Sequence, residues 1–236
     1  MIIGGKILIL YNKEKNESVK DYIYRNIKNN IMFLELKPGD LISESDLANI
    51  LDVSRTPVRE VLIRLKGENL IEVKPQTGTY VSLIDWRLIE DGIFIRDNLE
   101  KQALKEACKN FSKEALLKME KYILEQQVIC KKEDNLLVFH ELDNKFHKLI
   151  FSEIGRQNVW QIISNASNHY NRMRLLNEMN NNKEDLIQQH IKYFEIIKDK
   201  KIDEVDCVIY THIEEPINNW KNLIKNNIDI SKYVRL

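Results

Sequence analysis

Residues 53–60 read Val-Ser-Arg-Thr-Pro-Val-Arg-Glu and begin a helix that decides the fold of the N-terminal part of the chain. Ser54 is suited to cap this helix, and Pro57 falls in its first turn, where the missing N–H costs little. Ser43-Glu-Ser-Asp46 has the spacing of a capping box and begins a shorter helix just before it. Two helices joined by a tight turn, the second beginning with cations, are typical of a helix-turn-helix.

A further helix and a hairpin are expected on either side of this pair. Ser18-Val-Lys-Asp21 is a second capping box. Leu70–Val73 and Thr79–Leu83 carry strand-forming residues around a turn that ends in Gly78. Such a hairpin forms a wing, so residues 18–84 are predicted to form a winged helix-turn-helix domain.

The composition of the whole chain favours a mostly α protein. Its 236 residues carry 36 Lys and Arg against 36 Asp and Glu, so the net charge indicates nothing about partners. Seven glycines and four prolines leave few turn positions for an all-β fold. The three cysteines are scattered, and no segment approaches the roughly 20 apolar residues of a membrane span. We therefore expect a cytoplasmic protein that does not enter a membrane.

The C-terminal part, residues 85–226, is predicted to be an all-α antiparallel helical bundle. Residues 1–17 and 227–236 show no recognisable pattern and are treated as an N-terminal extension and a tail. Apolar periodicity predicts helices over 86–109, 113–132, 136–154, 158–178, 183–199 and 202–224.

Four polar residues interrupt the apolar faces of these helices. Asp143 and His147 are four residues apart, and His190 and His212 lie on the last two helices. A lone histidine on an apolar face is usually a core residue with one hydrogen bond, and an Asp-x-x-x-His pair can bond within its own helix. Taken together, one carboxylate and three imidazoles from three helices form a ligand set that suits Zn²⁺, Ni²⁺ or another divalent transition metal. His140 lies near the same side of its helix as Asp143.

The N-terminal motifs resemble a known family. Leu36-Lys-Pro-Gly-Asp40, Val53–Glu60 and Gly78-Thr-Tyr-Val81 are similar to the winged-helix domain of the GntR family of bacterial transcription regulators. An arginine at such a helix start can bond guanine O6 and N7, although the spacing of Arg55 and Arg59 alone also suits a solvated helix face. The resemblance implies DNA-contacting roles for Ser43, Ser54, Arg55, Thr56, Arg59 and Gly78.

Two positions depart from the family pattern. Asp52 occupies the turn between the two helices, where the family usually has Gly, so slight backbone strain is expected there. Ser45 stands where many members carry an arginine that touches DNA, so one DNA contact is expected to be absent.

The C-terminal motifs carry a second resemblance. Arg96-x-x-Leu-Glu100, Asp143-x-x-Phe-His147, His190 and His212 are similar to the metal-binding FCD ligand domain of FadR-type GntR regulators. The resemblance implies that Asp143, His147, His190 and His212 bind the metal, with His140 and His169 outside the set. It also implies a small carboxylate effector held by an arginine, for which Arg96 and Arg174 are the candidates, each with a surface ion pair as the alternative. Pro216 is expected to bend the last helix.

These expectations combine into a dimeric, metal-containing, ligand-responsive transcription regulator that is not an enzyme. By the habit of the family it is a repressor that binds operator DNA and a small organic acid. The rival hypothesis is a metal-dependent hydrolase or lyase, because an open metal position can activate water. Against it, the sequence has no H-E-x-x-H motif, and catalysis would leave Val53–Glu60 without a purpose. A structural metal that merely rigidifies the helical domain fits the same ligands.

Overall fold

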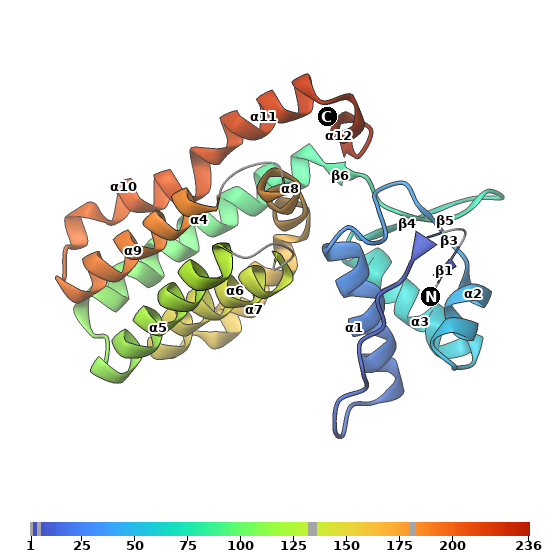
Figure 1. Ribbon diagram of the computed structural model, residues 1–236, viewed down its shortest axis with the longest axis horizontal. Coiled ribbons are helices and arrows are strands. Elements are labelled where there is room, and N and C mark those ends of the chain that lie inside the picture. The colour runs from blue at the N-terminus through green and yellow to red at the C-terminus, as the bar shows by residue number, and fades with distance from the viewer. Residues whose placement is uncertain (1, 4–5, 132–135, 180–182) are drawn as a thin grey trace. The chain divides into compact units, whose positions relative to one another are not determined.

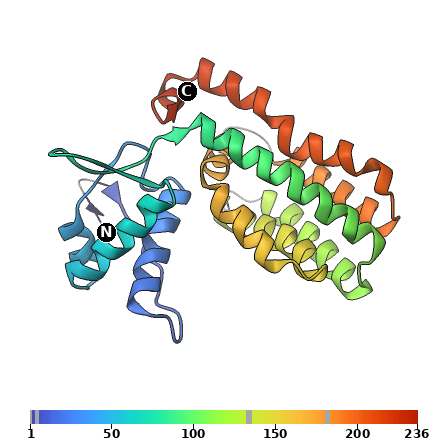
Figure 2. The same ribbon diagram turned by 180° about the vertical axis from the view of Figure 1, so that it is seen from behind.

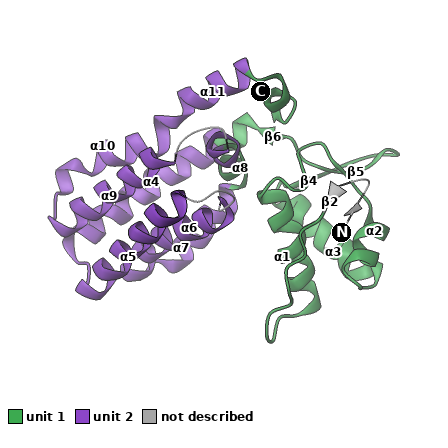
Figure 3. Cartoon of the chain, viewed as in Figure 1, with its two compact units in different colours: residues 1–89, 168–173, 227–236 green, residues 90–167, 174–226 purple. Residues whose placement is uncertain are grey.

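The computed structural model describes residues 2–3, 6–131, 136–179 and 183–236. The chain divides into two compact units (Figure 3). The first contains residues 1–89, 168–173 and 227–236, and the second contains residues 90–167 and 174–226. Each unit is described by itself below.

The first unit is built on the three helices α1 (Val19–Met32), α2 (Glu44–Ile50) and α3 (Arg55–Gly67) (Figure 1). The two predicted capping boxes cap α1 and α2, because Ser18 Oγ accepts a hydrogen bond from the Asp21 N–H and Ser43 Oγ accepts one from the Asp46 N–H. The helices bury a common apolar core that includes Ile23, Ile27, Ile31, Leu47, Val58, Leu62 and Leu65.

A three-stranded antiparallel sheet completes the winged helix. The strands are β3 (Leu41–Ile42), β4 (Ile71–Lys74) and β5 (Gly78–Val81), in the order β3-β5-β4. Gly78 has φ +136°, and a Cβ atom there would lie 2.7 Å from Leu41 Cδ1. Asp52 in the turn between α2 and α3 has φ +52°, the left-handed conformation expected for this departure from Gly.

The N-terminal extension lies along α1 after a short antiparallel pair, β1 (Ile2–Ile3) with β2 (Lys6–Ile7). Asn30 receives the Ile9 N–H on Oδ1 at 2.9 Å and donates from Nδ2 to the Ile9 carbonyl at 2.8 Å. Asn26, one turn earlier, makes the same pair of bonds to Tyr11 at 2.9 and 3.4 Å. Two buried amide side chains on one helix face therefore hold an extended segment as a neighbouring strand would.

The tail also belongs to the first unit. After α12 (Ile228–Ser231), strand β7 (Val234–Arg235) runs parallel to β6 (Ile84–Asp85), and the Ile84 N–H donates to the Tyr233 carbonyl at 2.8 Å. The Arg235 guanidinium lies 3.1 Å from the Glu72 carboxylate on β4. The tail buries the apolar side chains of Val234 and Ile230.

The second unit is all helical (Figures 1 and 2). Helix α5 packs against both α6 and α9, and α6 packs against α7. Within the described residues, no helix has the length and apolarity needed to cross a membrane. Helices α4 and α8 each begin in the first unit and continue into the second. The elements of the second unit are α4 (Trp86–Lys109), α5 (Lys113–Cys130), α6 (Leu136–Glu153), α7 (Gln157–Ala166), α8 (Asn168–Glu178), α9 (Glu184–Lys198), the 3₁₀ turn Ile202–Glu204, α10 (Val205–Ile209), the π-helical turn Tyr210–Glu214 and α11 (Pro216–Asn226).

The predicted fold class is confirmed, with one unexpected break in a helix and one interruption that was expected. The helix expected over 158–178 is two helices, α7 and α8, which meet at Ser167. The last helix is interrupted as expected near Pro216, whose ring nitrogen has no proton to donate to the carbonyl of His212. The chain responds with a π-helical turn in which the Glu215 N–H donates to the Tyr210 carbonyl, five residues back, at 3.0 Å.

Candidate functional site

The first turn of α3 presents the polar residues that the sequence predicts for DNA contact. Ser54, Arg55, Thr56 and Arg59 are all exposed, and the Ser54 side chain makes no capping bond. The Arg59 side chain is 70% exposed, and its Nη2 lies 3.2 Å from Glu44 Oε2 on α2. This face of α3 therefore exposes cationic and hydroxyl groups to solvent, and Glu44 orients the guanidinium of Arg59.

Ser43 and Gly78 have local structural roles as well. The Ser43 hydroxyl accepts the Asp46 N–H at 3.2 Å and lies 2.9 Å from Ser45 Oγ. Gly78 has the backbone conformation and the close approach to Leu41 that exclude a side chain. Both residues therefore shape the helix-turn-helix and the wing, whatever they contact on DNA.

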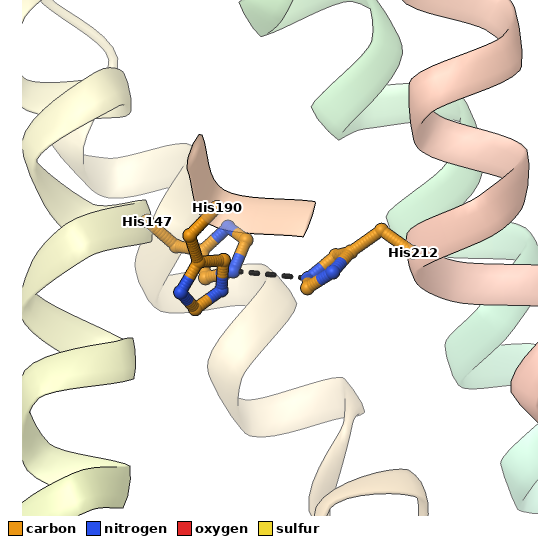
Figure 4. A group of neighbouring side chains, drawn as sticks. All are labelled: His147, His190 and His212. Atoms are coloured by element: carbon orange, nitrogen blue, oxygen red, sulfur yellow. Dashed lines mark hydrogen bonds between the residues drawn. The ribbon is translucent and has the colours of Figure 1, made fainter. Parts of the chain in front are cut away.

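In the helical unit, three predicted metal ligands meet at one point (Figure 4). His147 comes from α6, His190 from α9 and His212 from the π-helical turn. One ring nitrogen of each lies within 4.8 Å of those of the other two, and the Nε2 atoms of His147 and His212 are 3.2 Å apart. All three side chains are buried. The π-helical turn between α10 and α11 thus carries His212, the predicted metal ligand of this part of the chain.

Asp143, the fourth predicted ligand, faces the same point. Its Oδ1 atom lies 3.3 Å from His190 Nε2 and 3.9 Å from His147 Nε2. Asp143 Oδ1 and His190 Nε2 are both buried, and neither makes a hydrogen bond to any group of the described residues. Buried polar atoms without partners are costly, and a cation among these atoms would satisfy them. The donor set is therefore suited to a divalent transition metal.

The opposite ring nitrogen of each histidine faces an oxygen from another residue. Gln126 Oε1 accepts from His190 Nδ1 at 2.8 Å, and Gln189 Oε1 accepts from His212 Nδ1 at 2.9 Å. Glu100 Oε2 lies 3.2 Å from His147 Nδ1. Such partners fix the tautomer that leaves Nε2 free for a metal.

Sequence reasoning did not assign these three partners. Glu100 was visible only as the end of the Arg96-x-x-Leu-Glu100 motif. Gln126 continues the buried face of Ala115, Met119 and Ile123 on α5, and this position on an apolar face was the sequence signal that could have identified it as a buried polar residue.

Electrostatics favour the protonation states that a metal requires. Burial by itself would raise the pKa of the Asp143 carboxyl, but Arg174 and the neighbouring histidines hold it well below its usual range. Burial of Glu100 is likewise outweighed, by Arg96 and His147, and its pKa falls to about 2. Burial lowers the pKa of His190, and burial and the other imidazoles lower that of His212 further. At neutral pH the carboxylates of Asp143 and Glu100 are therefore charged, and the imidazoles of His190 and His212 are neutral.

Arg96 and Arg174, the predicted effector-binding residues, both form ion pairs, but these pairs are buried and do not lie at the surface. Arg96 Nε bonds Glu100 Oε1 at 2.5 Å. Arg174 Nη2 bonds Asp143 Oδ2 at 2.8 Å, which leaves Oδ1 directed toward the histidines. Each guanidinium therefore already holds a carboxylate of this chain.

The two histidines left out of the metal set lie in other networks. His140 Nε2 is 2.8 Å from Glu178 Oε2, and its Nδ1 is 3.0 Å from Arg174 Nη2. His169 belongs to the first unit, where Nδ1 accepts the Asp85 N–H and Nε2 lies 2.9 Å from the Asn69 carbonyl.

The comparisons with known proteins agree with these two assemblies. Residues 20–81 match the bacterial regulatory proteins of the gntR family, and residues 91–215 match the FCD domain. The chain belongs to the GntR family and carries an FCD domain, and it is a transcription regulator with a DNA-binding helix-turn-helix and an effector domain. The predicted family and general function are therefore confirmed.

Individual relatives cover most of the chain. The HTH-type transcriptional repressor RspR of Escherichia coli is 28% identical over 214 residues, which are 90% of this chain and 93% of RspR. A Streptomyces ambofaciens HTH-type regulator, described as lying in an unstable DNA locus, is 30% identical over 81% of this chain and 80% of its own length. The solved structure of E. coli McbR/YncC has the same fold, with a TM-score of 0.73 at 20% identity over 89% of this chain and 100% of that chain.

Proposed function

We propose that this regulator is a cytoplasmic homodimer that represses transcription from operator DNA and releases or tightens its hold when a small organic acid binds in the helical unit. The similarity to a protein named as a repressor supports the sign of regulation. In this proposal Arg55, Thr56 and Arg59 read base edges, while Ser43, Ser54 and the backbone at Gly78 contact the DNA backbone and minor groove.

The convergence of Asp143 Oδ1 with three imidazoles carries the sensory part of the proposal. Asp143, His147, His190 and His212 would hold a divalent transition metal, with Zn²⁺ or Ni²⁺ preferred because the ligands are mainly nitrogen. The metal would supply a positive charge that attracts a carboxylate. Arg96 and Arg174 would act on the acid through the carboxylates they hold, or directly after exchanging partners.

Elemental analysis of purified protein tests the metal. We expect about one divalent transition metal per chain, and a loss of occupancy by orders of magnitude in His190→Ala and in His212→Ala. His169→Gln, a histidine change outside the set, should keep full occupancy. Full occupancy in both alanine variants would show that these residues are core histidines.

A thermal-shift screen of organic acids then separates a sensor from the two rival roles of the metal. A sensor gains stability from an acid only when the metal is present, because a ligand of the native state raises the melting temperature by mass action. Stripping a structural metal with a chelator should instead unfold the helical unit. Turnover of an acid by metal-loaded protein would favour the enzyme hypothesis over our proposal that the chain is not an enzyme.

A further inference from the structure

Helix α8 belongs to both units, and its two halves make different contacts. Residues 168–173 belong to the first unit, and the helix continues through residues 174–178 of the second. Every residue from 172 to 176 is buried. Five consecutive residues cover the whole circumference of a helix, so the polar side chains of this stretch require partners inside the protein.

The first half of α8 holds both ends of the wing hairpin. Arg172 Nη2 donates to the Ser82 carbonyl, directly after β5, at 2.8 Å. His169 Nδ1 accepts the Asp85 N–H at 2.9 Å, and its Nε2 lies 2.9 Å from the Asn69 carbonyl, shortly before β4. Burial lowers the pKa of His169 to about 4, so the ring is neutral near pH 7. Its one proton is therefore on Nε2, which donates to Asn69.

The same half of α8 also reaches the end of α3, the helix that carries the predicted DNA contacts. Asn168 Nδ2 donates at 3.3 Å to the carbonyl of Glu68, the C-cap residue of α3. The Ser82 hydroxyl donates to the carbonyl of Asn69, the next residue along the chain. The C-terminal end of α3 and both ends of the wing are therefore tied to the same half helix. Displacing residues 168–173 would move both elements that the proposed function places on DNA.

Packing alone does not explain Arg172. Its side chain is fully buried, and within the described residues its only hydrogen bonds go to Ser82, while Nε has no partner. Burial lowers its pKa to about 9, and no carboxylate of the described chain opposes that effect. A buried charge without a counter-charge is unfavourable, whereas methionine would fill a similar space without that cost. What the arginine adds is the hold on the Ser82 carbonyl.

The second half of α8 contacts the candidate metal site. Arg174 Nη2 donates to Asp143 Oδ2 at 2.8 Å, and the other oxygen, Oδ1, lies 3.3 Å from His190 Nε2. A cation held at Oδ1 would restrain this carboxylate and, through it, Arg174. We propose that α8 transmits occupancy of the metal site to the DNA-binding unit, with Arg172 as the positioning residue that holds the wing. This inference rests on the proposed metal site and names how that site regulates DNA binding.

Hydrogen exchange followed by NMR, with Zn²⁺ alone as the probe, tests the role of α8. The Asp85 amide donates to His169, and the Ser82 amide donates to the Leu70 carbonyl beside the bond from Arg172. We expect Zn²⁺ to slow exchange at Asp85 and Ser82 at least about fivefold more than at buried amides of α1, because a restrained segment opens less often.

The amides of α1 are the control for global stabilisation. A ligand that merely stabilises the whole native state slows all amides that exchange through global unfolding. Equal slowing at α1, Asp85 and Ser82 would overturn the inference. Unchanged exchange at Asp85 and Ser82 in protein that holds Zn²⁺ would also overturn it, and the proposed metal site would remain.

Arg172→Met tests the part assigned to Arg172. Methionine keeps an unbranched side chain of similar reach and removes the donors to Ser82. With Zn²⁺, exchange at Asp85, which His169 holds, should still slow, whereas the slowing at Ser82 should fall to less than about twofold. Arg87→Met makes the same change at an exposed arginine of the first unit and should leave both responses as in the wild type.

The remaining outcomes separate the inference from the proposed function. An unchanged Ser82 response in Arg172→Met, in protein whose circular dichroism and zinc content match the wild type, would overturn the role of Arg172. If that variant does not fold, exchange in the wild type alone decides whether α8 responds to the metal. A wild type that binds no Zn²⁺ would overturn the proposed metal site and the inference together.

Discussion

Arg59, whose guanidinium is exposed and paired with Glu44, is proposed to contact DNA from the first turn of α3. We expect Arg59→Ala to weaken binding to a specific operator by about 1–3 kcal/mol, because in the proposed function this arginine bonds base edges. Competition titrations against random DNA at fixed salt measure the effect. Arg64→Ala, which removes an arginine stacked on Tyr24, is the control. Equal losses on both DNAs would mean that Arg59 contacts only phosphate.

Gln126 tests whether the Nδ1 partners position the metal ligands. Gln126→Met keeps the volume of the side chain and removes the acceptor for His190. Metal affinity should fall about 10–100-fold, as expected when the outer partner of a ligand is lost. Competition with a chelator provides the measurement, and Gln127→Met at the adjacent half-buried position should have no effect. An unchanged affinity would reduce Gln126 to a packing residue.

His169 makes the stability of the first unit depend on pH. Burial, with Arg172 nearby, lowers its pKa to about 4, so the unfolded chain binds the proton more readily between that pH and the ordinary value of 6.5. The contribution is therefore complete above pH 6.5 and is lost as the pH falls toward 4. From pH 7 to 5 the wild type should lose about 2 kcal/mol more than His169→Gln. Parallel curves from urea unfolding at each pH would contradict this.

Among individual residues, the sequence pointed to the candidate metal ligands but not to the residues that contact their Nδ1 atoms. Asp143, His147, His190 and His212 were visible because a polar residue that interrupts an apolar helix face requires an explanation. Gln189 gave no such signal, since a glutamine beside a histidine on an amphipathic helix is usually solvated. Its role depends on how α9 faces the π-helical turn, which is a tertiary contact.

The segment of the N-terminal extension around Ile9 and Tyr11 is held by asparagine side chains of α1 and not by a neighbouring strand. In Asn30→Ala the Ile9 N–H and carbonyl lose both partners in a partly buried position. We expect the free energy of unfolding to fall by about 1–3 kcal/mol in urea titrations. Asn29→Ala at the half-buried neighbouring position is the control. Equal effects of the two changes would assign the loss to helix propensity.

The helices and the wing followed from the sequence, whereas the short strands did not. Capping boxes and apolar periodicity located α1, α2 and most of the bundle, because these signals are local. Strands β3, β6 and β7 have two residues each, too few to show an alternating pattern. The break at Ser167 lies within a continuous apolar periodicity, so it also depends on tertiary packing.

For the whole molecule, the proposed acid must change the affinity for operator DNA by the same factor by which operator DNA changes the affinity for the acid. Strand β6 runs directly into α4, so a change in the helical unit has a short covalent route to the winged helix. We expect the best acid to change operator affinity by 5–150-fold, the range of roughly 1–3 kcal/mol typical of coupled sites. Operator titrations with and without acid test this in the wild type and in Asp143→Ala, where the change should vanish. An acid that binds without altering wild-type operator affinity would contradict the switch.

The pairing of β6 with β7 has a consequence for how the protein is made. A ribosome synthesises the winged helix first and residues 227–236 only after the whole helical unit. Strand β6 therefore has no partner strand until all four candidate metal ligands have been translated. A product of interrupted translation that lacks His212 also lacks β7, so loss of this candidate metal ligand by truncation also leaves β6 without its partner strand.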